Sequence, residues 1–278
     1  HNIRDYGIFL RTDFHDFMDE DADLQRQLIE AVNEICFEEE IIETVLPHGA
    51  WDNGKPGDCN WMLRSTQWSH WAYIWQREVL KRGGRKVLEV DPGFGLMSLV
   101  LLKEFPDIKL DWALLGKENG SIFSGKNSEF TYGLKKIKKW YGERINELWG
   151  KIEGDKFYLT EKKYDLIIMT EVFEHFVLKP LKVMQKIHNS LADKGILILT
   201  TPDWGHVHIY EHWEDMPEDE QISEERYEQM LKCEHVYQYS KEELEDIFGR
   251  CGFEIIRYRL SDSNNHNYML RKKSGNVL

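Results

Sequence analysis

The sequence predicts an α/β fold in which one mostly parallel β-sheet carries helices on both faces. From residue 86 onward, short apolar runs alternate with longer amphipathic segments, which is the pattern of a parallel sheet built from strand–helix units. One of these runs, "VLEV", enters the glycine-containing turn "DPGFG" and then a helical segment. At 278 residues the chain is long enough to bury a large core.

Seven strands and four helices are expected in this part of the chain. The strands are expected at residues 86–90, 108–115, around 151–153, 165–170, 196–201, 254–260 and 267–271. Helices are expected between the first five strands at residues 96–105, 134–148 and 180–192. A fourth helix begins with a capping box formed by Ser240 and Glu243 and ends at Gly252.

The N-terminal part of the chain has helical patterning of its own. Leu24, Leu28 and Ala31 recur at helical spacing within residues 15–46, so an amphipathic helix is expected there. We therefore divide the chain into an N-terminal helical extension or lid, residues 1–80, and a main domain, residues 81–278, with an insert at about residues 202–235.

Tryptophans crowd the end of the N-terminal extension. Trp68, Trp71 and Trp75 follow three- and four-residue spacing, which places them on one face of a helix. One interpretation is a helix that packs against the sheet. The other is a lid whose aromatic side chains, together with Arg64, close over a bound substrate. The same extension is the expected contact surface of a homodimer.

Composition and charge exclude several classes of protein. The net charge of −13 disfavours nucleic acid, whose binding depends on neutralising phosphates with Lys and Arg. No apolar run reaches the roughly 18 residues needed to span a bilayer, and no signal-peptide core is found. The four cysteines lack the spacing of a zinc or disulfide framework and suit a reducing compartment. We expect a cytoplasmic protein.

The turn after the first strand has the features of a ligand-binding loop. Gly93 and Gly95 let the backbone approach a ligand, and the free N–H groups at the start of the next helix favour an anionic group. A third glycine and an acid some 20 residues later would indicate a dinucleotide. Ser98 stands at the third position, and Asp111 lies inside the second strand. Taken alone, the turn leaves open a structural strand–turn–helix that binds nothing.

Five segments occur in the order and spacing of a known family: "EVDPGFG", "EGD", "YDLIIMTEVFEHF", "LADKGILILTTPDWG" and "HVYQYSKEELEDIFGRCGFE". Together they resemble the class I S-adenosylmethionine-dependent methyltransferases, above all the branch of ubiquinone-biosynthesis, sugar and natural-product O-methyltransferases. The resemblance covers roughly residues 85–260. It implies a Rossmann-like, seven-stranded, mostly parallel sheet, S-adenosylmethionine as cofactor and a small-molecule substrate.

The resemblance also implies which residues contact the cofactor. Gly93 and Gly95 would give backbone contacts, and Asp155 falls where the family's acid meets the adenine amino group. The other positions would line the methionine portion, namely Glu89, Asp91, Thr170 and Glu171.

Three positions depart from the family pattern. Asp91 replaces the first loop glycine, Pro92 follows it, and Leu114 aligns with the ribose-binding acid. The Asp91 carboxylate either binds the cofactor's ammonium group or marks a weakened site. A catalytically silent Rossmann-like binding protein therefore stays an alternative. A nicotinamide-dependent oxidoreductase is disfavoured, because the later segments do not fit it.

Methyl transfer to an alcohol needs a group that takes the proton. The cofactor supplies an electrophilic methyl group, so the protein has to align the acceptor and deprotonate it. Histidine is the usual proton acceptor near neutral pH. His208 is the first candidate, with His206 beside it and His175 after the fourth strand. His206, His208, His212 and Glu211 could instead hold a divalent metal or be ordinary loop residues, and we assign no metal ligand.

The expected reaction is O-methylation of a small polar metabolite. A saccharide or sugar nucleotide is the first hypothesis, and a phenolic natural product is the alternative. The residues expected to contact this substrate lie in the N-terminal extension and near the insert: Arg64, Trp68, Trp204, His212 and His235.

Overall fold

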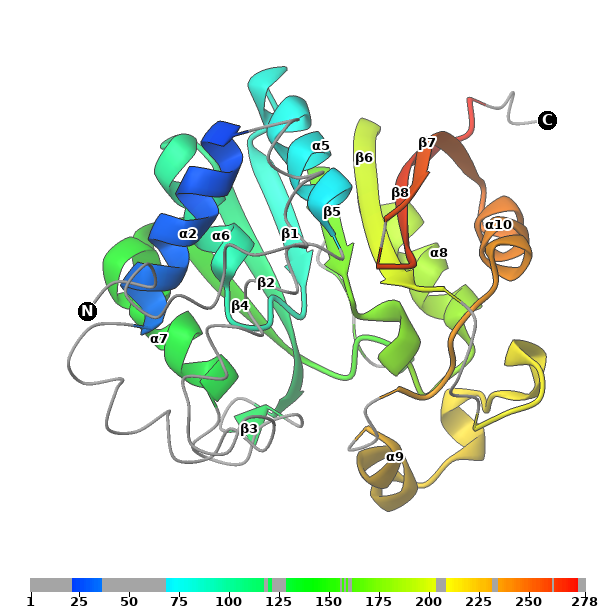
Figure 1. The fold of residues 1–278 in the computed structure, drawn as a ribbon. Helices are drawn as coiled ribbons and strands as arrows, with labels where there is room; N and C mark the ends of the chain where they lie inside the picture. Colours follow the sequence, from blue (N-terminus) through cyan, green and yellow to red (C-terminus); the bar gives the residue numbers. More distant parts are fainter. Residues whose placement is uncertain are drawn as a thin grey trace.

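The fold is built on one twisted sheet, shown in Figure 1 for a computed structural model of the chain. The structure describes residues 22–36, 69–117, 120–121, 129–155, 157, 159, 162–203, 209–231, 235–261 and 263–274. Five parallel strands form its centre in the order β4, β2, β1, β5, β6. Their bounds are β1 Lys86–Val90, β2 Lys109–Lys117, β4 Ile145–Gly150, β5 Tyr164–Thr170 and β6 Leu191–Pro202.

Two antiparallel pairings complete the sheet. β8 (Asn265–Lys272) pairs antiparallel with β6 and with β7 (Phe253–Leu260). At the opposite side, the short β3 (Gly120–Ser121) pairs antiparallel with the end of β2. The predicted seven-stranded, mostly parallel sheet is confirmed, with β3 as a small addition.

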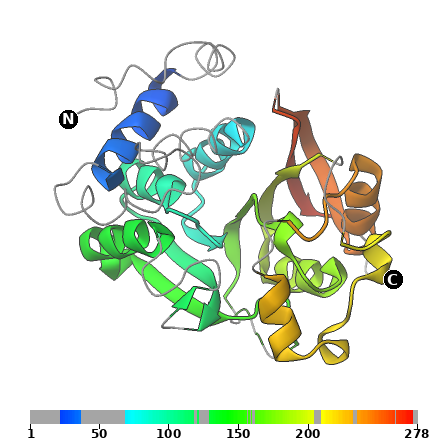
Figure 2. The ribbon, with the colours of Figure 1, turned by 60° about the horizontal axis from the view of Figure 1, so that its bottom comes forward.

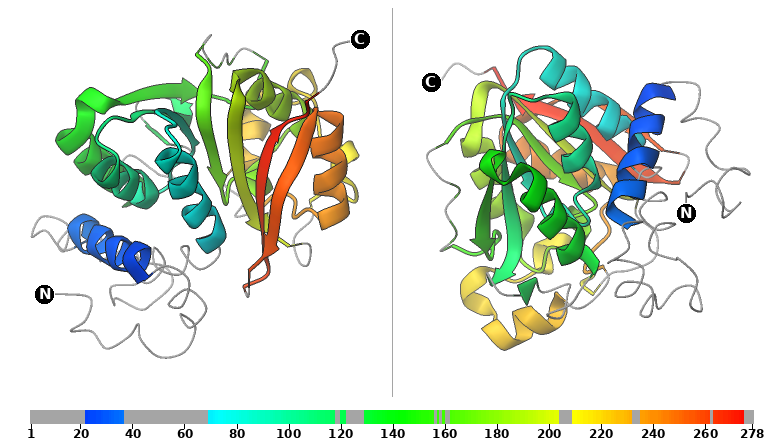
Figure 3. Two further views of the ribbon diagram at one scale, coloured as in Figure 1. Left: turned by 90° about the horizontal axis from the view of Figure 1, so that it is seen from above. Right: turned by 90° about the vertical axis from the view of Figure 1, so that its left-hand side faces the viewer.

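Helices cover both faces of the sheet, as Figure 3 shows from above. Alternate residues of each strand pack into two separate hydrophobic cores, because successive side chains of a strand point to opposite faces of the sheet. Val87 packs with the helices of one face, and Leu88 packs with those of the other. The first face carries α2 (Ala22–Cys36), α5 (His70–Lys81), α6 (Leu96–Glu104) and α7 (Glu129–Tyr141), and the second carries α8 (Pro180–Ser190) and α10 (Lys241–Arg250).

The helix that follows the glycine turn is apolar on all sides. Every residue of α6 from Leu96 to Leu102 is buried, because α2 covers the side of α6 that would otherwise face solvent. α2 buries Leu24, Leu28 and Ala31, so the helical spacing in the sequence correctly marks its inner face.

Of the two interpretations of the tryptophan segment, packing against the sheet accounts for its described part. α5 contacts β5, β6 and β8, and Trp75 is buried in the core. Arg77, 3% exposed, donates to Glu104 of α6 at 2.5 and 3.1 Å and to Asp23 of α2 at 3.0 Å. One guanidinium therefore links three helices. Residues 37–68, with Arg64 and Trp68, lie outside the described residues.

One predicted strand and part of one predicted helix are wrong. The fourth strand in chain order is β4 at Ile145–Gly150, whereas residues 151–153 lie in a turn, and α7 ends at Tyr141 rather than at residue 148. The apolar residues of β4 continue the helical spacing of α7, which hides the boundary. Six parallel pairs with β2 stabilise the strand instead. Arg144 fixes the turn before it by donating to the carbonyl groups of Leu102, Phe105 and Ile108.

The insert forms short helical elements beside the edge at which β1 and β5 end. Figure 2 turns this edge toward the viewer, with α9 in gold. The elements are η5 (Trp213–Asp215), η6 (Asp219–Gln221) and α9 (Glu224–Met230). Tyr227 and Met230 of α9 are buried, while most of its acidic residues are exposed. No helix in the described part of the chain has the length and apolar character to cross a membrane.

Replacing Arg77 by Ala is expected to destabilise the protein by about 3 kcal/mol, because Glu104 would lose both hydrogen bonds from Arg77 in a largely buried site and keep only Lys81 at 3.8 Å. Chemical denaturation followed by circular dichroism measures this change. Arg26→Ala is the control: Arg26 is exposed on α2 and pairs with Glu30, so its loss should change stability little. Equal effects of the two substitutions would contradict the structural role of Arg77.

Candidate active site

The turn after β1 holds three residues with left-handed backbone conformation. They are Asp91 at φ 48°, Gly93 at φ 54° and Gly95 at φ 77°. Gly95 is the N-cap of α6, and a Cβ atom there would lie 2.5 Å from Ile137 of α7. Glycine is therefore required at this position by the packing of α7 as well as by any ligand. For Asp91 the conformation is strained, which marks a position held by its surroundings.

The Asp91 carboxylate has no hydrogen bond or ion pair among the described residues. Its side chain is partly buried, and burial raises its pKa to about 6. The backbone around it is fixed, since the Asp91 N–H donates to the Ala113 carbonyl at 2.9 Å. Among the described residues, Asp91 therefore presents an acceptor without a partner at the end of β1.

Glu89 is buried in β1 and bonds to α6 instead of facing solvent. The Ser98 hydroxyl donates to the Glu89 carboxylate, and Trp112 Nε1 of β2 donates to the same hydroxyl oxygen at 2.8 Å. Burial raises the pKa of Glu89 to about 7, the Ser98 hydrogen bond opposes this, and the charge of Asp91 adds to it. This chain explains why Ser98 replaces a glycine: without its hydroxyl, two buried polar groups would lose their partner.

Glu171 follows β5 and connects three elements. Its backbone is left-handed at φ 54°. Its carboxylate accepts hydrogen bonds from Thr200 of β6 at 2.6 Å, from Ser69 beside α5 at 3.3 Å and from Asn265 of β8 at 2.7 Å. Burial nonetheless raises its pKa to about 7. The sequence predicted Glu171 as a site residue but not these three partners. Each partner appears in the sequence only as a polar residue at the end of an apolar strand or at the start of a helix.

Glu174 and His175 lie one turn further, in η4 (Phe173–His175). Glu174 is 1% exposed, and burial together with the charges of Glu171 and Asp91 raises its pKa well above the usual range. His175 lies edge-on to His235, with 5.1 Å between the ring centroids. Burial, with a smaller contribution from His235, lowers the pKa of His175 to about 3. His175 is therefore a neutral ring at physiological pH and a weak proton acceptor.

The sequence of residues 68–258 matches the profile of a methyltransferase domain family. The chain belongs to this family. The resemblance noted in the sequence is thereby confirmed, and S-adenosylmethionine is the cofactor of the family. No curated protein matches the methyltransferase.

One solved structure supports the same fold, and two more are similar over parts of their length. An O-methyltransferase family protein from Burkholderia thailandensis superposes with a TM-score of 0.50 at 10% identity, over 97% of this chain and 68% of that one. A putative O-methyltransferase from Nostoc punctiforme gives 0.49 at 14% identity, over 90% and 70%. An O-methyltransferase family 2 protein from Planctomyces limnophilus gives 0.46 at 16% identity, over 69% and 51%, so the methyltransferase spans about half of that protein's length.

The charges at the ends of β1 and β5 fit the cofactor of the family. Asp91, Glu171 and Glu174 lie close enough for the charges of the first two to act on the third. S-adenosylmethionine carries a sulfonium and an ammonium group, and a cation among carboxylates relieves their mutual repulsion. This edge of the methyltransferase combines a glycine turn with acidic groups, of which Asp91 has no partner among the described residues.

Asp155 lies in a loop that the insert holds in place. Its backbone N–H donates to Asp219 of η6 at 2.8 Å, and its carboxylate pairs with Lys182 of α8 at 3.2 Å. In the same loop, buried Glu153 accepts a hydrogen bond from the Tyr227 hydroxyl at 2.8 Å. The insert thus shapes the loop to which the resemblance assigns the adenine contact.

The remaining predicted residues are only partly placed. Thr170 ends β5, His235 lies beside His175, and exposed His212 precedes η5. Leu114 is buried in β2 opposite Trp149, so the ribose-binding acid of the family has no counterpart there. Four further predicted residues lie outside the described part of the chain, in addition to Arg64: Trp68, Trp204, His206 and His208.

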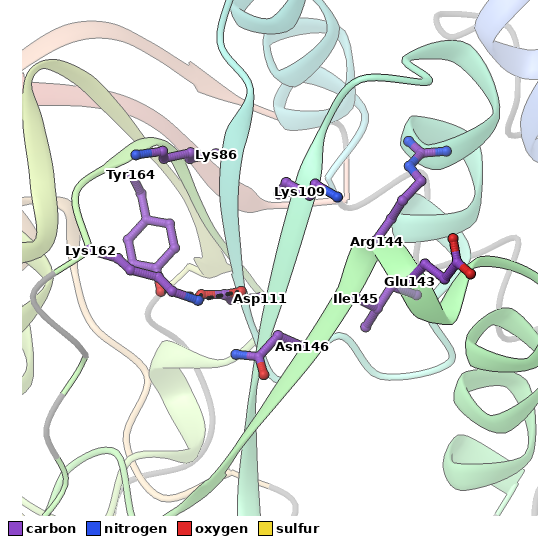
Figure 4. A pocket seen from close by; sticks show the side chains of 9 residues that line it. All are labelled: Lys86, Lys109, Asp111, Glu143, Arg144, Ile145, Asn146, Lys162 and Tyr164. Atoms are coloured by element: carbon purple, nitrogen blue, oxygen red, sulfur yellow. Dashed lines mark hydrogen bonds and ion pairs between the residues drawn. The ribbon is translucent and has the colours of Figure 1, made fainter.

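Asp111 belongs to the opposite edge of the sheet. It accepts hydrogen bonds from the Tyr164 hydroxyl at 2.6 Å and from Lys162 at 3.0 Å (Figure 4). These residues line a cavity of about 300 Å³ at the amino ends of β1, β2, β4 and β5. Asp111 therefore cannot bind a ribose at the edge where Asp91 and Glu171 lie.

The contribution of Glu89 to the free energy of unfolding is expected to fall as the pH rises from about 4.5 to 7. In this range folded Glu89, with a pKa of about 7, holds a proton that the unfolded chain, with the ordinary pKa of 4.5, has lost. The folded state therefore binds more protons than the unfolded chain in this range. The stability that protonated Glu89 contributes below pH 4.5 is lost as the pH rises to 7, by at most about 1.4 kcal/mol per pH unit for one group.

Urea unfolding across this pH range measures the slope. Glu89→Gln should remove one group's share of it. Glu254→Gln is the matched control, because Glu254 is exposed and its pKa is lowered by Arg271, which places its titration below this range. An unchanged slope in Glu89→Gln would show that Glu89 does not retain its proton in the folded protein.

Proposed function

We propose that the protein transfers a methyl group from S-adenosylmethionine to an oxygen atom of a small polar molecule. The observation that carries the proposal is the group of carboxylates Asp91, Glu171 and Glu174 beside a glycine turn, in a chain of a methyltransferase family. When bound, the cofactor supplies an electrophilic methyl group attached to a sulfonium. The protein's own residues have to bind the cofactor, orient the acceptor molecule and remove the proton from its hydroxyl group.

The proposed binding roles follow the ends of the strands. Asp91 holds the cofactor's ammonium group, and the backbone of Gly93 and Gly95 lies against the methionine portion. Glu89, Thr170 and Glu171 line the same portion, Glu89 and Glu171 through networks that also fix β1 and β5. Asp155 meets the adenine amino group from the loop that the insert stabilises.

The proposed proton acceptor is His208, with His206 as the alternative. Both follow β6, whose carboxyl end lies beside that of β5. An imidazole at this place would take the proton of the acceptor hydroxyl, while the bound cofactor would supply the electrophilic methyl group. His175 is less suited to this role, because its lowered pKa of about 3 makes it a poor base near neutral pH.

The proposed substrate is a saccharide or sugar nucleotide, with a phenolic natural product as the alternative. Its contacts are assigned to Arg64, Trp68, Trp204, His212 and His235. Aromatic rings with a few polar groups suit the apolar faces and hydroxyls of both kinds of molecule. A cytoplasmic location and a homodimer formed through the N-terminal extension belong to the same proposal.

Calorimetry with S-adenosylmethionine and with its demethylated product tests the cofactor assignment. Wild-type protein is expected to bind both in the micromolar range. Asp91→Asn should weaken binding by about 10–100-fold, the effect of losing one charged hydrogen bond. Wild-type affinity should also fall as the pH drops below about 6, because protonated Asp91 no longer attracts the ammonium group. In Asp91→Asn this pH dependence should largely disappear.

Asp203→Asn is the matched control, since Asp203 follows β6 and pairs with His266. It should leave cofactor affinity unchanged. If neither ligand gives heat of binding or a thermal shift at millimolar concentration, the proposal of methyl transfer is wrong. The alternative of a catalytically silent binding protein is then favoured.

His208→Ala should lower turnover about 100-fold or more while cofactor affinity stays the same, because general-base catalysis typically contributes that much. The measurement is methyl transfer to a panel of sugar nucleotides and phenols, read by mass spectrometry. His188→Ala, on α8 and edge-on to Phe253, is the control and should retain wild-type turnover. Unchanged turnover in His208→Ala would show that His208 is not the proton acceptor.

A further inference from the structure

Three potential metal ligands converge beside the end of β5. They are Glu174 and His175 of η4 and His235 of the segment before α10, which we call the Glu174 cluster. One ligand atom of each lies within 4.8 Å of the others. The Glu174 Oε1 and His175 Nε2 atoms are 3.8 Å apart, and the two imidazole rings meet edge-on. The cluster joins residues that are 60 positions apart in the sequence.

The backbone fixes this arrangement. The Glu174 carbonyl accepts hydrogen bonds from Val236 N–H at 2.8 Å and from Tyr237 N–H at 3.2 Å, which holds the His235 segment against η4. A Thr201 hydroxyl donates to Glu174 Oε2 at 3.1 Å. Gln238 lies 2.8 Å from His235 Nδ1. Each of these contacts orients a member of the cluster, as outer contacts do for metal ligands.

The ligand types match a first-row transition metal. Two imidazoles and one carboxylate suit Zn²⁺, whereas Mg²⁺ and Ca²⁺ prefer oxygen ligands alone. Zn²⁺ holds nitrogen and oxygen atoms at about 2.0–2.2 Å in a tetrahedral arrangement, so two ligand atoms on one ion lie about 3.4 Å apart. The ligand atoms of the cluster, at 3.8 Å for Glu174 Oε1 and His175 Nε2 and within 4.8 Å for all three, would have to move closer together around the ion.

The charge around Glu174 favours a cation at this place. Its carboxylate is buried, the negative charges of Glu171 and Asp91 act on it, and no lysine or arginine in the described part of the chain forms an ion pair with it. A buried carboxyl group either takes up a proton or is paired with a cation or a metal, and a metal between Glu174 and the two imidazoles would hold it in the charged form.

We propose that Glu174, His175 and His235 form a Zn²⁺ site with an open fourth position. The proposal concerns metal binding and does not depend on methyl transfer. It differs from the sequence-based alternative of a metal held by His206, His208, Glu211 and His212, because it uses only His235 and the two η4 residues.

Binding of Zn²⁺ alone to the full chain tests the site. Metal-free protein is titrated with Zn²⁺ in competition with a chromogenic chelator, and Co²⁺ serves as a second probe through the visible absorption of its tetrahedral complexes. Wild-type protein is expected to bind one ion per chain tightly. Glu174→Gln keeps the shape of the side chain, His235→Asn keeps a polar side chain without the ligating ring, and each should lower the affinity more than 100-fold. Gln238→Ala removes an orienting contact and should lower it about 10–100-fold.

Two controls make the outcome specific. His188→Asn removes a histidine outside the cluster and should leave binding unchanged. The double variant His206→Asn with His208→Asn should also bind one ion. Circular dichroism and thermal melts show that each variant is folded. Absence of stoichiometric binding to the wild type, full affinity in Glu174→Gln and His235→Asn, or loss of binding only in the double variant would each overturn the proposal.

Discussion

Buried negative charge at the ends of β1 and β5 is the constraint on which this site depends. Neighbouring parallel strands end at the same edge of a sheet, so Asp91, Glu171 and Glu174 are drawn together by topology alone. The protein satisfies Glu171 with three donors and Glu174 with a threonine hydroxyl, but it gives Asp91 no partner among the described residues. No lysine or arginine of the described residues pairs with these three carboxyl groups, so a cationic ligand would supply the missing positive charge.

Two cations can meet this need at different ends of the same group of carboxylates. The ammonium of the cofactor is assigned to Asp91, beside the glycine turn. Zn²⁺ is assigned to Glu174, where two imidazoles add the ligands that a metal needs and an ammonium does not. The Glu171 carboxylate already accepts hydrogen bonds from Thr200, Ser69 and Asn265.

Most of the fold was predictable because buried strands and amphipathic helices leave periodic patterns. β1, β5 and α8 were predicted within one or two residues, while the boundary between α7 and β4 was wrong. There, Ile145 and Leu148 continue a helical period, and only pairing with β2 makes them a strand. Ser98 is a similar case: the sequence shows a missing glycine, but its bonds to Glu89 and Trp112 depend on β1, α6 and β2 being side by side.

The site was predictable where its residues follow strands, and unpredictable where they come from distant elements. Asp91 and Glu171 stand directly after β1 and β5, so their place at the edge follows from the strand pattern. Ser69 and Asn265 reach Glu171 across 102 and 94 residues of sequence, and no local pattern marks such contacts. For the same reason the sequence did not predict that His235 lies beside His175, although both histidines were predicted as site residues.

The contacts of α5 also bear on what covers the active site. A lid has to move, but α5 is held at its start, where Ser69 bonds to Glu171 and Thr200, and in its middle, where Arg77 bonds to α2 and α6. In the described part of the chain, the carboxyl edge is instead covered by the insert, which Tyr227 anchors to Glu153. Since the insert bonds to the loop of Glu153 and Asp155, changes in the insert should affect this loop, to which the adenine contact is proposed, more than they affect Asp91.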